Sequence, residues 1–543
     1  MTVSITFLGG LGEIGRNCAA LDIDGTLALI DCGLMFPDEH MLGVDLVLPD
    51  LASVVERSDD LECVFLTHGH EDHVGALAWL LQEVNVPVYG TPLALELTRS
   101  RLDEAGVTPD LRPVGMGEWL EHGPFEYMFV PVSHSIPQGA GIAFRTSEGI
   151  VLHSGDFKLD PTPIDGVPTD LPEFAALGRE GVRLLLSDST NAEVSGFVPS
   201  ESSLGQPLYE IVVETTGRLI AACFASHIHR IQQIADAAVD ANRSIAFVGR
   251  SMLRNVPIAG DLGLLDIPSE RILPLDEVLD LPPHEAAIIS TGSQGEPFAA
   301  LSLMAAGEHR AMRIAEGDTV LISARPIPGN ETKVSRVING LTRLGAKVFH
   351  GNNAAVHVSG HAAREELKTF INVVRPEAFV PVHGEYRHLK AHVDLAEEMK
   401  VPEVFLAEDG DRIVLDNGDA RLERDAVPAR YVFVDGLEVA GDVQGVIRDR
   451  RHLAEDGVVV VTVAVDRRTG EILQGPDLED HGFIDDPGDV FEHAAAEVVK
   501  AMAKIDWPQD REQVERNIRS AVNRVTRAET GKKAVVIPVV LEV

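Results

Sequence analysis

Hydrophobic and polar positions divide the 543-residue chain into parts with different periodicity. In residues 1–199, short apolar and β-branched runs alternate with turns rich in Gly, Pro and Asp, a pattern typical of a strand-rich layered structure. The runs expected to form strands are residues 3–8, 18–23, 26–31, 63–67, 127–131, 150–153 and 184–187. Residues 354–434 return to short strands and histidine-rich loops.

Between residues 200 and 353, helical patterns alternate with buried-strand patterns. Helical periodicity occurs at 228–241 and 332–344, and apolar runs lie at 219–224, 244–248, 286–290 and 319–323. This βα alternation predicts a doubly wound parallel sheet. A polar, Asp-rich stretch at 435–456 is interpreted as a linker. Residues 457–543 are interpreted as a small α+β domain with a helix near 490–504 and a last strand near 534–540.

Composition and the first residues predict a cytoplasmic protein. No stretch approaches the roughly 20 consecutive apolar residues of a membrane span, and the N-terminal residues lack the basic segment of a secretory signal. The cysteines are scattered and form no CxxC pair, which favours reduced thiols over disulfides or a thiolate zinc site. These cysteines are Cys18, Cys32, Cys63 and Cys223.

The segment Thr67-His-Gly-His-Glu-Asp-His73 carries the strongest chemical signal. It follows an apolar strand run and precedes a helical pattern, so its side chains can converge at the end of a strand. Imidazole nitrogen and carboxylate oxygen are ligands that suit zinc or manganese. Three histidines and an aspartate with this spacing therefore predict a site for two metal ions.

Three more candidate ligands, His134, Asp156 and His383, each follow an apolar run. Any one of them alone would more often be an ordinary loop residue than a ligand. Together with the first segment they form a set large enough for two ions: His68, His70, Asp72, His73, His134, Asp156 and His383.

Asp31, the HxHxDH segment, His134 and Asp156 resemble, in this order, the recurring motifs of the metallo-β-lactamase superfamily. The resemblance implies an αββα sandwich that binds two divalent ions, Zn²⁺ or Mn²⁺. It also implies that Asp31 orients a ligand histidine through a hydrogen bond. The implied ligands are His68, His70 and His134 for one ion and Asp72, His73 and His383 for the other, with Asp156 bridging.

Residues 200–353 interrupt this domain as the β-CASP domain does in nucleases of the superfamily. Three further positions are similar to motifs of that branch. They are Asp188 in Ser187-Asp-Ser-Thr-Asn, His361 in His357-Val-Ser-Gly-His, and His383. Phrases such as Thr291-Gly-Ser-Gln-Gly-Glu-Pro resemble the ribonuclease J family, and the resemblance covers nearly the whole chain. DNA-directed relatives tend to have valine in place of His383, so the resemblance favours RNA as substrate.

The resemblance implies a 5′-to-3′ exonuclease on 5′-monophosphorylated single-stranded RNA that also cuts internally, in RNA maturation and mRNA decay. A metal-bridging hydroxide would attack the phosphorus in line, and His361, Asp72 and Asp188 would take part in catalysis. The C-terminal domain implies a homodimer or homotetramer, and the resemblance admits partners from an RNA-degradation complex. The residues implied to bind the RNA 5′ end are Ser226, His227, Ile228, His357, Val358, Ser359, Gly360 and His361.

The family also has a structural Ca²⁺ site. The matching residues are Gly43, Asp45 and Asp435, whose carbonyl and carboxylate oxygens suit calcium. An isolated loop aspartate is more often a turn residue than a ligand, so both interpretations stay open.

The net charge of −39 is unexpected for a protein that handles a polyanion. Residues 200–353 carry 13 basic and 17 acidic residues, so most of the acidity lies outside this segment. Bound divalent ions would also add positive charge where the chemistry occurs.

Other functions stay open from the sequence. The same scaffold supports small-molecule hydrolases such as thioesterases and lactonases, as well as DNA nucleases and metal-free binding subunits of RNA-processing complexes. Gly10-Leu-Gly-Glu-Ile-Gly15 matches the GxGxxG pattern of dinucleotide-binding folds. That motif requires a following helix, whereas strands are expected here, so a nicotinamide cofactor is disfavoured.

Overall fold

The computed structural model describes all residues except 1, 39, 328, 437, 441–443 and 506–510. The chain divides into two compact units. The first contains Met1–Phe36 and Leu46–Val432, and the second contains Pro37–Asp45 and Phe433–Val543. Among the described residues, no helix combines the length and the apolar character needed to cross a membrane.

The first unit contains two large sheets that enclose a core. One has the order β23 (Asp419–Glu423), β22 (Arg412–Asp416), β1 (Thr2–Gly9), β3 (Cys18–Ile23), β4 (Thr26–Ile30), β6 (Leu61–Phe65), β7 (Val88–Gly90) and β8 (Leu111–Pro113). The other has the order β21 (Glu403–Val404), β19 (Ala378–Val382), β13 (Val182–Asp188), β12 (Gly149–His153), β11 (Ala140–Thr146), β10 (Phe125–Pro131) and β9 (Leu120–His122). Buried side chains such as Phe7, Phe65, Phe129 and Val380 fill the space between them.

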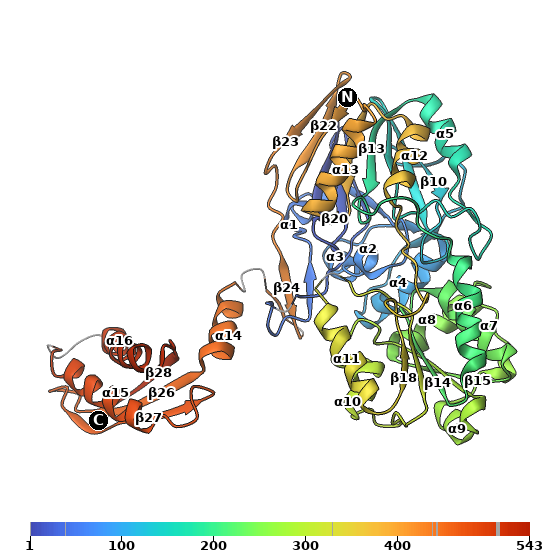
Figure 1. The fold of residues 1–543 in the computed structure, drawn as a ribbon. Coiled ribbons are helices and arrows are strands. Elements are labelled where there is room, and N and C mark those ends of the chain that lie inside the picture. Colours follow the sequence, from blue (N-terminus) through green and yellow to red (C-terminus); the bar gives the residue numbers. More distant parts are fainter. Residues whose placement is uncertain (1, 39, 328, 437, 441–443, 506–510) are drawn as a thin grey trace. The chain divides into compact units, whose positions relative to one another are not determined.

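Helices cover the outer faces of these sheets. In Figure 1, α5 (Leu171–Glu180), α12 (Arg364–Val374) and α13 (Tyr386–Glu398) lie beside β13, and Phe174, Phe370 and Leu395 pack against that sheet. On the other side, α4 (Pro92–Glu104) contacts β7, β8 and α3 (Leu77–Glu83). The order helix, sheet, sheet, helix is the predicted αββα sandwich, which is therefore confirmed.

The sandwich is interrupted in sequence but continuous in space. Strand β13 pairs in parallel with β19, with Leu184 opposite Ala378 and Asp188 opposite Val382. The whole inserted segment lies between these two strands in the chain. After Gly10, the structure continues with β2 (Leu11–Gly12) and β3 rather than a helix, as expected for the GxGxxG segment.

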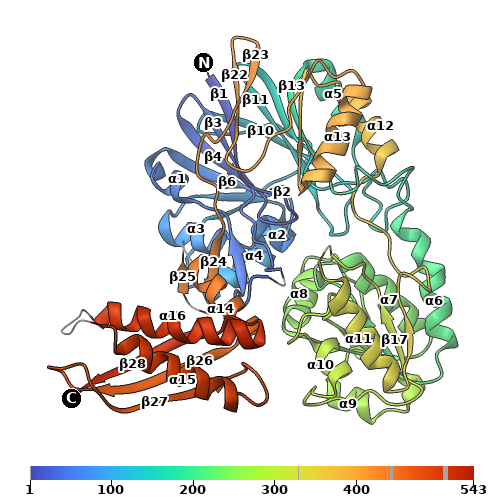
Figure 2. The same ribbon diagram turned by 60° about the vertical axis from the view of Figure 1, so that its left-hand side comes forward.

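The inserted segment forms a five-stranded sheet in which all pairings are parallel. Its order is β15 (Ser244–Val248), β16 (Ala286–Ser290), β14 (Leu219–Ala222), β17 (Thr319–Ile322) and β18 (Lys347–Phe349). One face packs against α6 (Gly205–Glu214), α7 (Ile228–Asp240) and α8 (Arg250–Asp261). The other packs against α9 (Leu275–Asp280), α10 (Ala300–Ala306) and α11 (Glu331–Arg343), as the βα alternation predicted (Figure 2).

The second unit contains a sheet of β27 (Ile472–His481), β26 (Val458–Val465) and β28 (Val535–Glu542). Helices α15 (Gly488–Met502) and α16 (Arg511–Thr530) cover one face, where Val461 packs with Val498 and Ile518. This is the predicted small α+β domain.

The segment expected as a linker has regular structure. It contains the end of β24 (Val432–Asp435), β25 (Glu438–Ala440) and α14 (Gln444–Asp456). The Asp-rich composition suggested an irregular chain, but Arg, Leu, Ala and Glu in 448–455 have high helix propensity. Residues 437 and 441–443 of this segment lie outside the described residues.

Candidate metal centre

The candidate ligands lie on loops that follow strands. Asp31 follows β4, and the His68–His73 loop follows β6 and runs into α2 (Glu71–Val74). His134, Asp156 and His383 follow β10, β12 and β19 in the second sheet. Because β4 is parallel to β6, and β12, β13 and β19 are parallel to one another, the loops after these strands meet at one edge of the sandwich.

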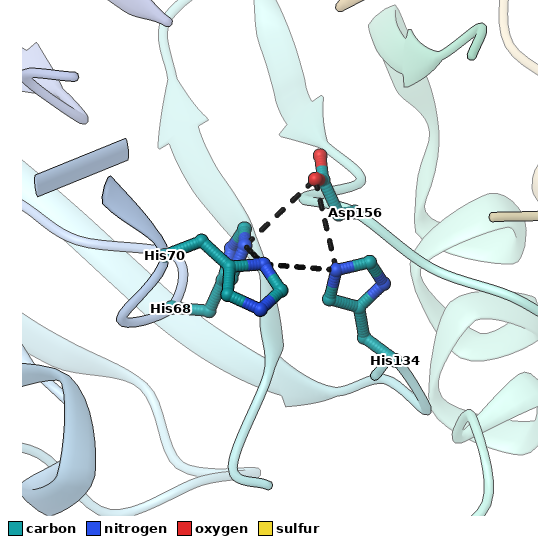
Figure 3. A group of neighbouring side chains, drawn as sticks. All are labelled: His68, His70, His134 and Asp156. Atoms are coloured by element: carbon teal, nitrogen blue, oxygen red, sulfur yellow. Dashed lines mark hydrogen bonds and ion pairs between the residues drawn. The ribbon is translucent and has the colours of Figure 1, made fainter. Parts of the chain in front are cut away.

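His68, His70, His134 and Asp156 form a first candidate metal group (Figure 3). The distance from Asp156 Oδ2 is 3.7 Å to His68 Nε2 and 3.8 Å to His134 Nε2. His70 Nδ1 lies 3.0 Å from His68 Nε2 and 3.2 Å from His134 Nε2. Three imidazoles and a carboxylate thus face one point, as in a tetrahedral site.

Asp72, His73, His383 and Asp156 form a second group. His73 Nε2 lies 3.2 Å from Asp156 Oδ2, and His383 Nδ1 lies 2.8 Å from Asp156 Oδ1. His383 Nε2 lies 3.4 Å from Asp72 Oδ2. Asp156 belongs to both groups, so its carboxylate has the position of a bridge.

The protonation states of the first group fit metal ligands. Burial lowers the pKa of His68 and His134 well below the usual histidine value and that of His70 to about 4. Burial by itself would raise the pKa of Asp156, but His383 and His73 overcome this and hold it well below its usual value. Neutral imidazoles beside an ionised carboxylate are the forms that bind a divalent cation. In the second group, burial disfavours the charged imidazoles, but Asp156 raises the pKa of His73 well above the usual value and that of His383 to about 10, so a cation bound there would displace their protons.

Hydrogen bonds fix the orientation of two of the histidines. His73 Nδ1 donates to Asp31 Oδ2 at 2.7 Å, and the Thr67 backbone N–H donates to Asp31 Oδ1 at 2.8 Å. His134 Nδ1 donates to the Gly360 carbonyl at 2.8 Å, which leaves Nε2 free for the first group. Hydrogen bonds of this kind set the orientation of ligand histidines and so change the affinity of the site for the metal. The sequence predicted no role for Thr67 and assigned Gly360 only to substrate binding.

His361 and Asp188 lie beside the second group. His361 Nδ1 is 2.8 Å from Asp188 Oδ2, and together with Asp156 and His383 they form a third cluster. Burial disfavours the charged imidazole, but Asp188 raises the pKa of His361 above its usual value. His361 therefore holds a proton more readily than a free histidine, as His73 and His383 of the second group also do.

Four family models match the chain: the metallo-beta-lactamase superfamily (residues 11–188), the ribonuclease J beta-CASP domain (216–341), the Zn-dependent metallo-hydrolase RNA specificity domain (352–406) and the ribonuclease J C-terminal domain (445–543). Ribonuclease J of Mycobacterium tuberculosis is 42% identical over 99% of this chain and 97% of its own length. The chain belongs to the ribonuclease J family. Ribonuclease J2 of Bacillus subtilis is 38% identical over 100% of this chain and 99% of its own length.

The family expected from the motifs is thus confirmed. A crystal structure of a protein of unknown function from Enterococcus faecalis V583 matches 76% of this chain and 100% of its own chain, with a TM-score of 0.53 and 17% identity. At that identity the likeness concerns the fold alone.

In this ribonuclease J family chain, the two loops implied to bind the RNA 5′ end lie close together. Ile228 and Val358 are buried in one hydrophobic cluster that joins the loops, so neither side chain is accessible to a ligand. Asn191 Nδ2 donates to Ser359 Oγ and to the His361 carbonyl, both at 2.8 Å, which fixes the second loop.

Buried nitrogens of these two loops lack partners. Nδ1 of His227 and Nδ1 of His357 have no hydrogen-bond partner among the described residues, whereas His227 Nε2 lies 3.3 Å from Glu201 Oε1. Burial lowers the pKa of both histidines, that of His357 to about 3. Buried polar atoms normally form a hydrogen bond, so these nitrogens are suited to bind a ligand or a water molecule. Ser226 lies directly before His227, at the start of α7.

The residues of the implied calcium site lie together in the second unit, but a cation of the chain is already among them. The Arg450 guanidinium donates to the Gly43 carbonyl at 3.0 Å and contacts the Asp435 carboxylate. Asp45 Oδ2 accepts from the Gly436 backbone N–H at 2.8 Å. A Ca²⁺ ion between Gly43 and Asp435 would require Arg450 to move, so the calcium site stays a prediction.

Proposed function

We propose that this chain is a metal-dependent ribonuclease. It degrades single-stranded RNA from 5′-monophosphorylated ends in the 5′-to-3′ direction, cuts internally as well, and acts in RNA maturation and mRNA decay in the cytoplasm. The observation that carries the proposal is the pair of ligand groups sharing Asp156, in a chain with the ribonuclease J domains.

The donor set suits two divalent ions, Zn²⁺ or Mn²⁺. His68, His70 and His134 would hold one ion and Asp72, His73 and His383 the other, with Asp156 shared. When bound, two such ions supply a water of lowered pKa and stabilise the charge that develops on the phosphoryl oxygens.

Side chains of the protein donate and accept the protons of the reaction. His361, held by Asp188, donates a proton to the leaving 3′ oxygen, a role worth about 10²–10⁴ in rate. The Asp72 side chain is 29% exposed, so its carboxylate is accessible to water in the site. Attack by water in line leaves a 5′-phosphate on the product, which is the end group that the next round of cleavage uses.

The unpaired Nδ1 atoms of His227 and His357 support binding of a terminal phosphate. Ser226, Ser359 and backbone N–H groups of the loop 357–361 complete a set of donors suited to a monophosphate. Two such loops beside a metal centre select RNA by its 5′ end.

We also propose the domain division 1–199 with 354–434, 200–353, 435–456 and 457–543. The last of these assembles homodimers or homotetramers. Proteins of an RNA-degradation complex are further partners.

The test uses RNAs that differ only in a 5′-monophosphate, 5′-triphosphate or 5′-hydroxyl, incubated with the full chain and Mn²⁺ or Zn²⁺. We expect mononucleotides, released fastest from the monophosphate RNA. His70→Ala should abolish cleavage, whereas His284→Ala, on an exposed side chain, should not. RNA that stays intact under every metal condition, with hydrolysis of a thioester or lactone instead, would contradict the proposal.

A further inference from the structure

Helix α8 of the inserted domain contacts the metal-binding loop through Arg254. Arg254 Nη2 lies 3.8 Å from Glu71 Oε1, and Arg101 of α4 donates to the same carboxylate oxygen. Glu71 stands between His70 and Asp72 in the chain. An ion pair from the inserted domain therefore ends between two candidate metal ligands.

The next residue of α8 contacts the loop proposed to bind the RNA 5′ end. Asn255 is buried, and its Nδ2 donates to the carbonyl of Ala225 at 3.2 Å, directly before Ser226. Arg254 Nε donates to Asn255 Oδ1 at 3.1 Å. Arg254 and Asn255, which are hydrogen-bonded to each other, thus contact the metal-binding loop and the loop proposed to bind the RNA 5′ end.

Close packing between α4 and α8 restricts the movement of both helices. Leu93 and Leu97 of α4 share a hydrophobic cluster with Met252 and Val256 of α8. A Cβ on Gly69 of the metal-binding loop would come within 2.8 Å of Leu97 Cδ1, so this loop lies directly against α4. The metal-binding loop, α4 and α8 form one closely packed block.

We propose that Arg254 and Asn255 are positioning residues that fix the separation between the 5′-phosphate loop and the metal centre. This role rests on the proposed function. Binding of a remote phosphate accelerates cleavage only if the bound phosphate and the reacting bond are held in one geometry. Arg254 and Asn255 act through Glu71 and Ala225 rather than by contact with RNA.

The role predicts a difference between substrates. An RNA with a 5′-monophosphate uses both sites and depends on their separation, whereas an RNA with a 5′-hydroxyl uses the metal centre without the phosphate loop. Arg254→Gln should fold normally, because partly exposed ion pairs contribute little to stability. Asn255→Ala is a second, independent variant that releases the other end of the link.

The experiment measures kcat/KM of the full chain with Mn²⁺ on two RNAs identical except for the 5′ end. In both variants, we expect the ratio of monophosphate to hydroxyl RNA to fall about tenfold or more, with the hydroxyl rate nearly unchanged. Arg271→Gln is the matched control, since it removes an arginine of the same domain that contacts Asn242 at the end of α7. Melting temperatures verify that each variant is folded.

Each outcome has a distinct meaning. Equal losses on both RNAs in Arg254→Gln would overturn the proposal, because Arg254 would then support the metal centre itself or bind RNA irrespective of its 5′ end. An unchanged ratio would overturn it as well. A wild-type chain that cleaves both RNAs equally would refute 5′-end recognition and with it the positioning role, whereas a preference lost only in the variants supports both.

Discussion

At the scale of single residues, Gly360 shows why a small side chain is needed beside the metal centre. Its carbonyl accepts the hydrogen bond of His134, and a Cβ at this position would lie 2.9 Å from the His134 ring. We expect Gly360→Ala to displace His134 and weaken metal binding about 10- to 100-fold, the usual effect of losing a residue that orients a ligand. Competition with a fluorescent chelator measures this affinity.

Gly351→Ala is the control for this substitution. A Cβ at Gly351 meets nothing within 4 Å, so the same chemical change should leave metal binding as it is. Equal affinities of the two variants would show that the ring of His134 tolerates the methyl group, against the expectation.

Asp409 predicts a pH dependence of stability. Burial raises the pKa of its carboxyl group to about 7, next to Glu13 and Arg16. The unfolded value is about 3.9, so between these values the folded chain binds more protons than the unfolded chain. The stabilising contribution is therefore complete at acidic pH and is lost as the pH rises through about 7.

We expect the melting temperature to fall by about 2–4 °C from this group between about pH 5 and about pH 8. Asp409→Asn cannot titrate, and its single carboxamide oxygen can accept from only one of the two donors, Arg16 Nη2 or the Leu11 N–H. Its melting temperature should therefore be lower than that of the wild type at acidic pH but vary less over this range. Calorimetry of both proteins at matched ionic strength checks this. A slope that survives in Asp409→Asn would assign the pH dependence to other groups.

At the scale of elements, a buried ionic cluster joins the inserted domain to the sandwich. Glu201 of the 3₁₀ helix Glu201–Leu204 contacts Arg230 of α7, and its other oxygen lies 3.8 Å from Lys158 Nζ. Arg230 and Lys158 are almost fully buried. Glu201→Gln would leave the buried Arg230 without its carboxylate partner, at a cost of about 3–5 kcal/mol, whereas Lys158 Nζ keeps Asp160 Oδ2 at 3.3 Å.

Urea unfolding measures this loss. Glu210→Gln, on the exposed face of α6, is the matched control and should change the free energy of unfolding little. If the two variants unfold at the same urea concentration, the buried cluster is not a source of stability.

The elements that the sequence predicted are those set by local pattern. Each apolar run ending in a polar loop, such as 150–153 before Asp156, became a strand that carries its candidate ligand to the edge of the sheet. Contacts between distant segments could not be predicted in this way. The residues around His134 and Glu201 in the sequence do not indicate that His134 bonds to the Gly360 carbonyl or that Glu201 contacts Arg230. At 435–456, the polar, Asp-rich composition suggested a linker. The helix propensity of the residues in this segment is consistent with the helix α14 that the structure contains.

At the scale of the whole molecule, the sheet of the second unit carries exposed apolar side chains on one side. Helices α15 and α16 pack on the side that carries Val459, Val461 and Val463. On the opposite side of β28, Ile537 is 46% exposed and Leu541 52% exposed. Apolar side chains exposed on one side of a strand favour contact with a second copy of the chain, because such contact removes apolar surface from water.

The proposed homodimer or homotetramer would bury this sheet face. Ile537→Asp with Leu541→Asp places two charges on it while the helix-covered face, and so the fold of the domain, is preserved. We expect the double variant to sediment as a smaller species than the wild type at equal concentration. Val213→Asp adds a charge to another exposed apolar site, on α6, and should sediment like the wild type. A wild-type chain that is already monomeric, or a double variant with unchanged sedimentation, would show that this face is not the assembly surface.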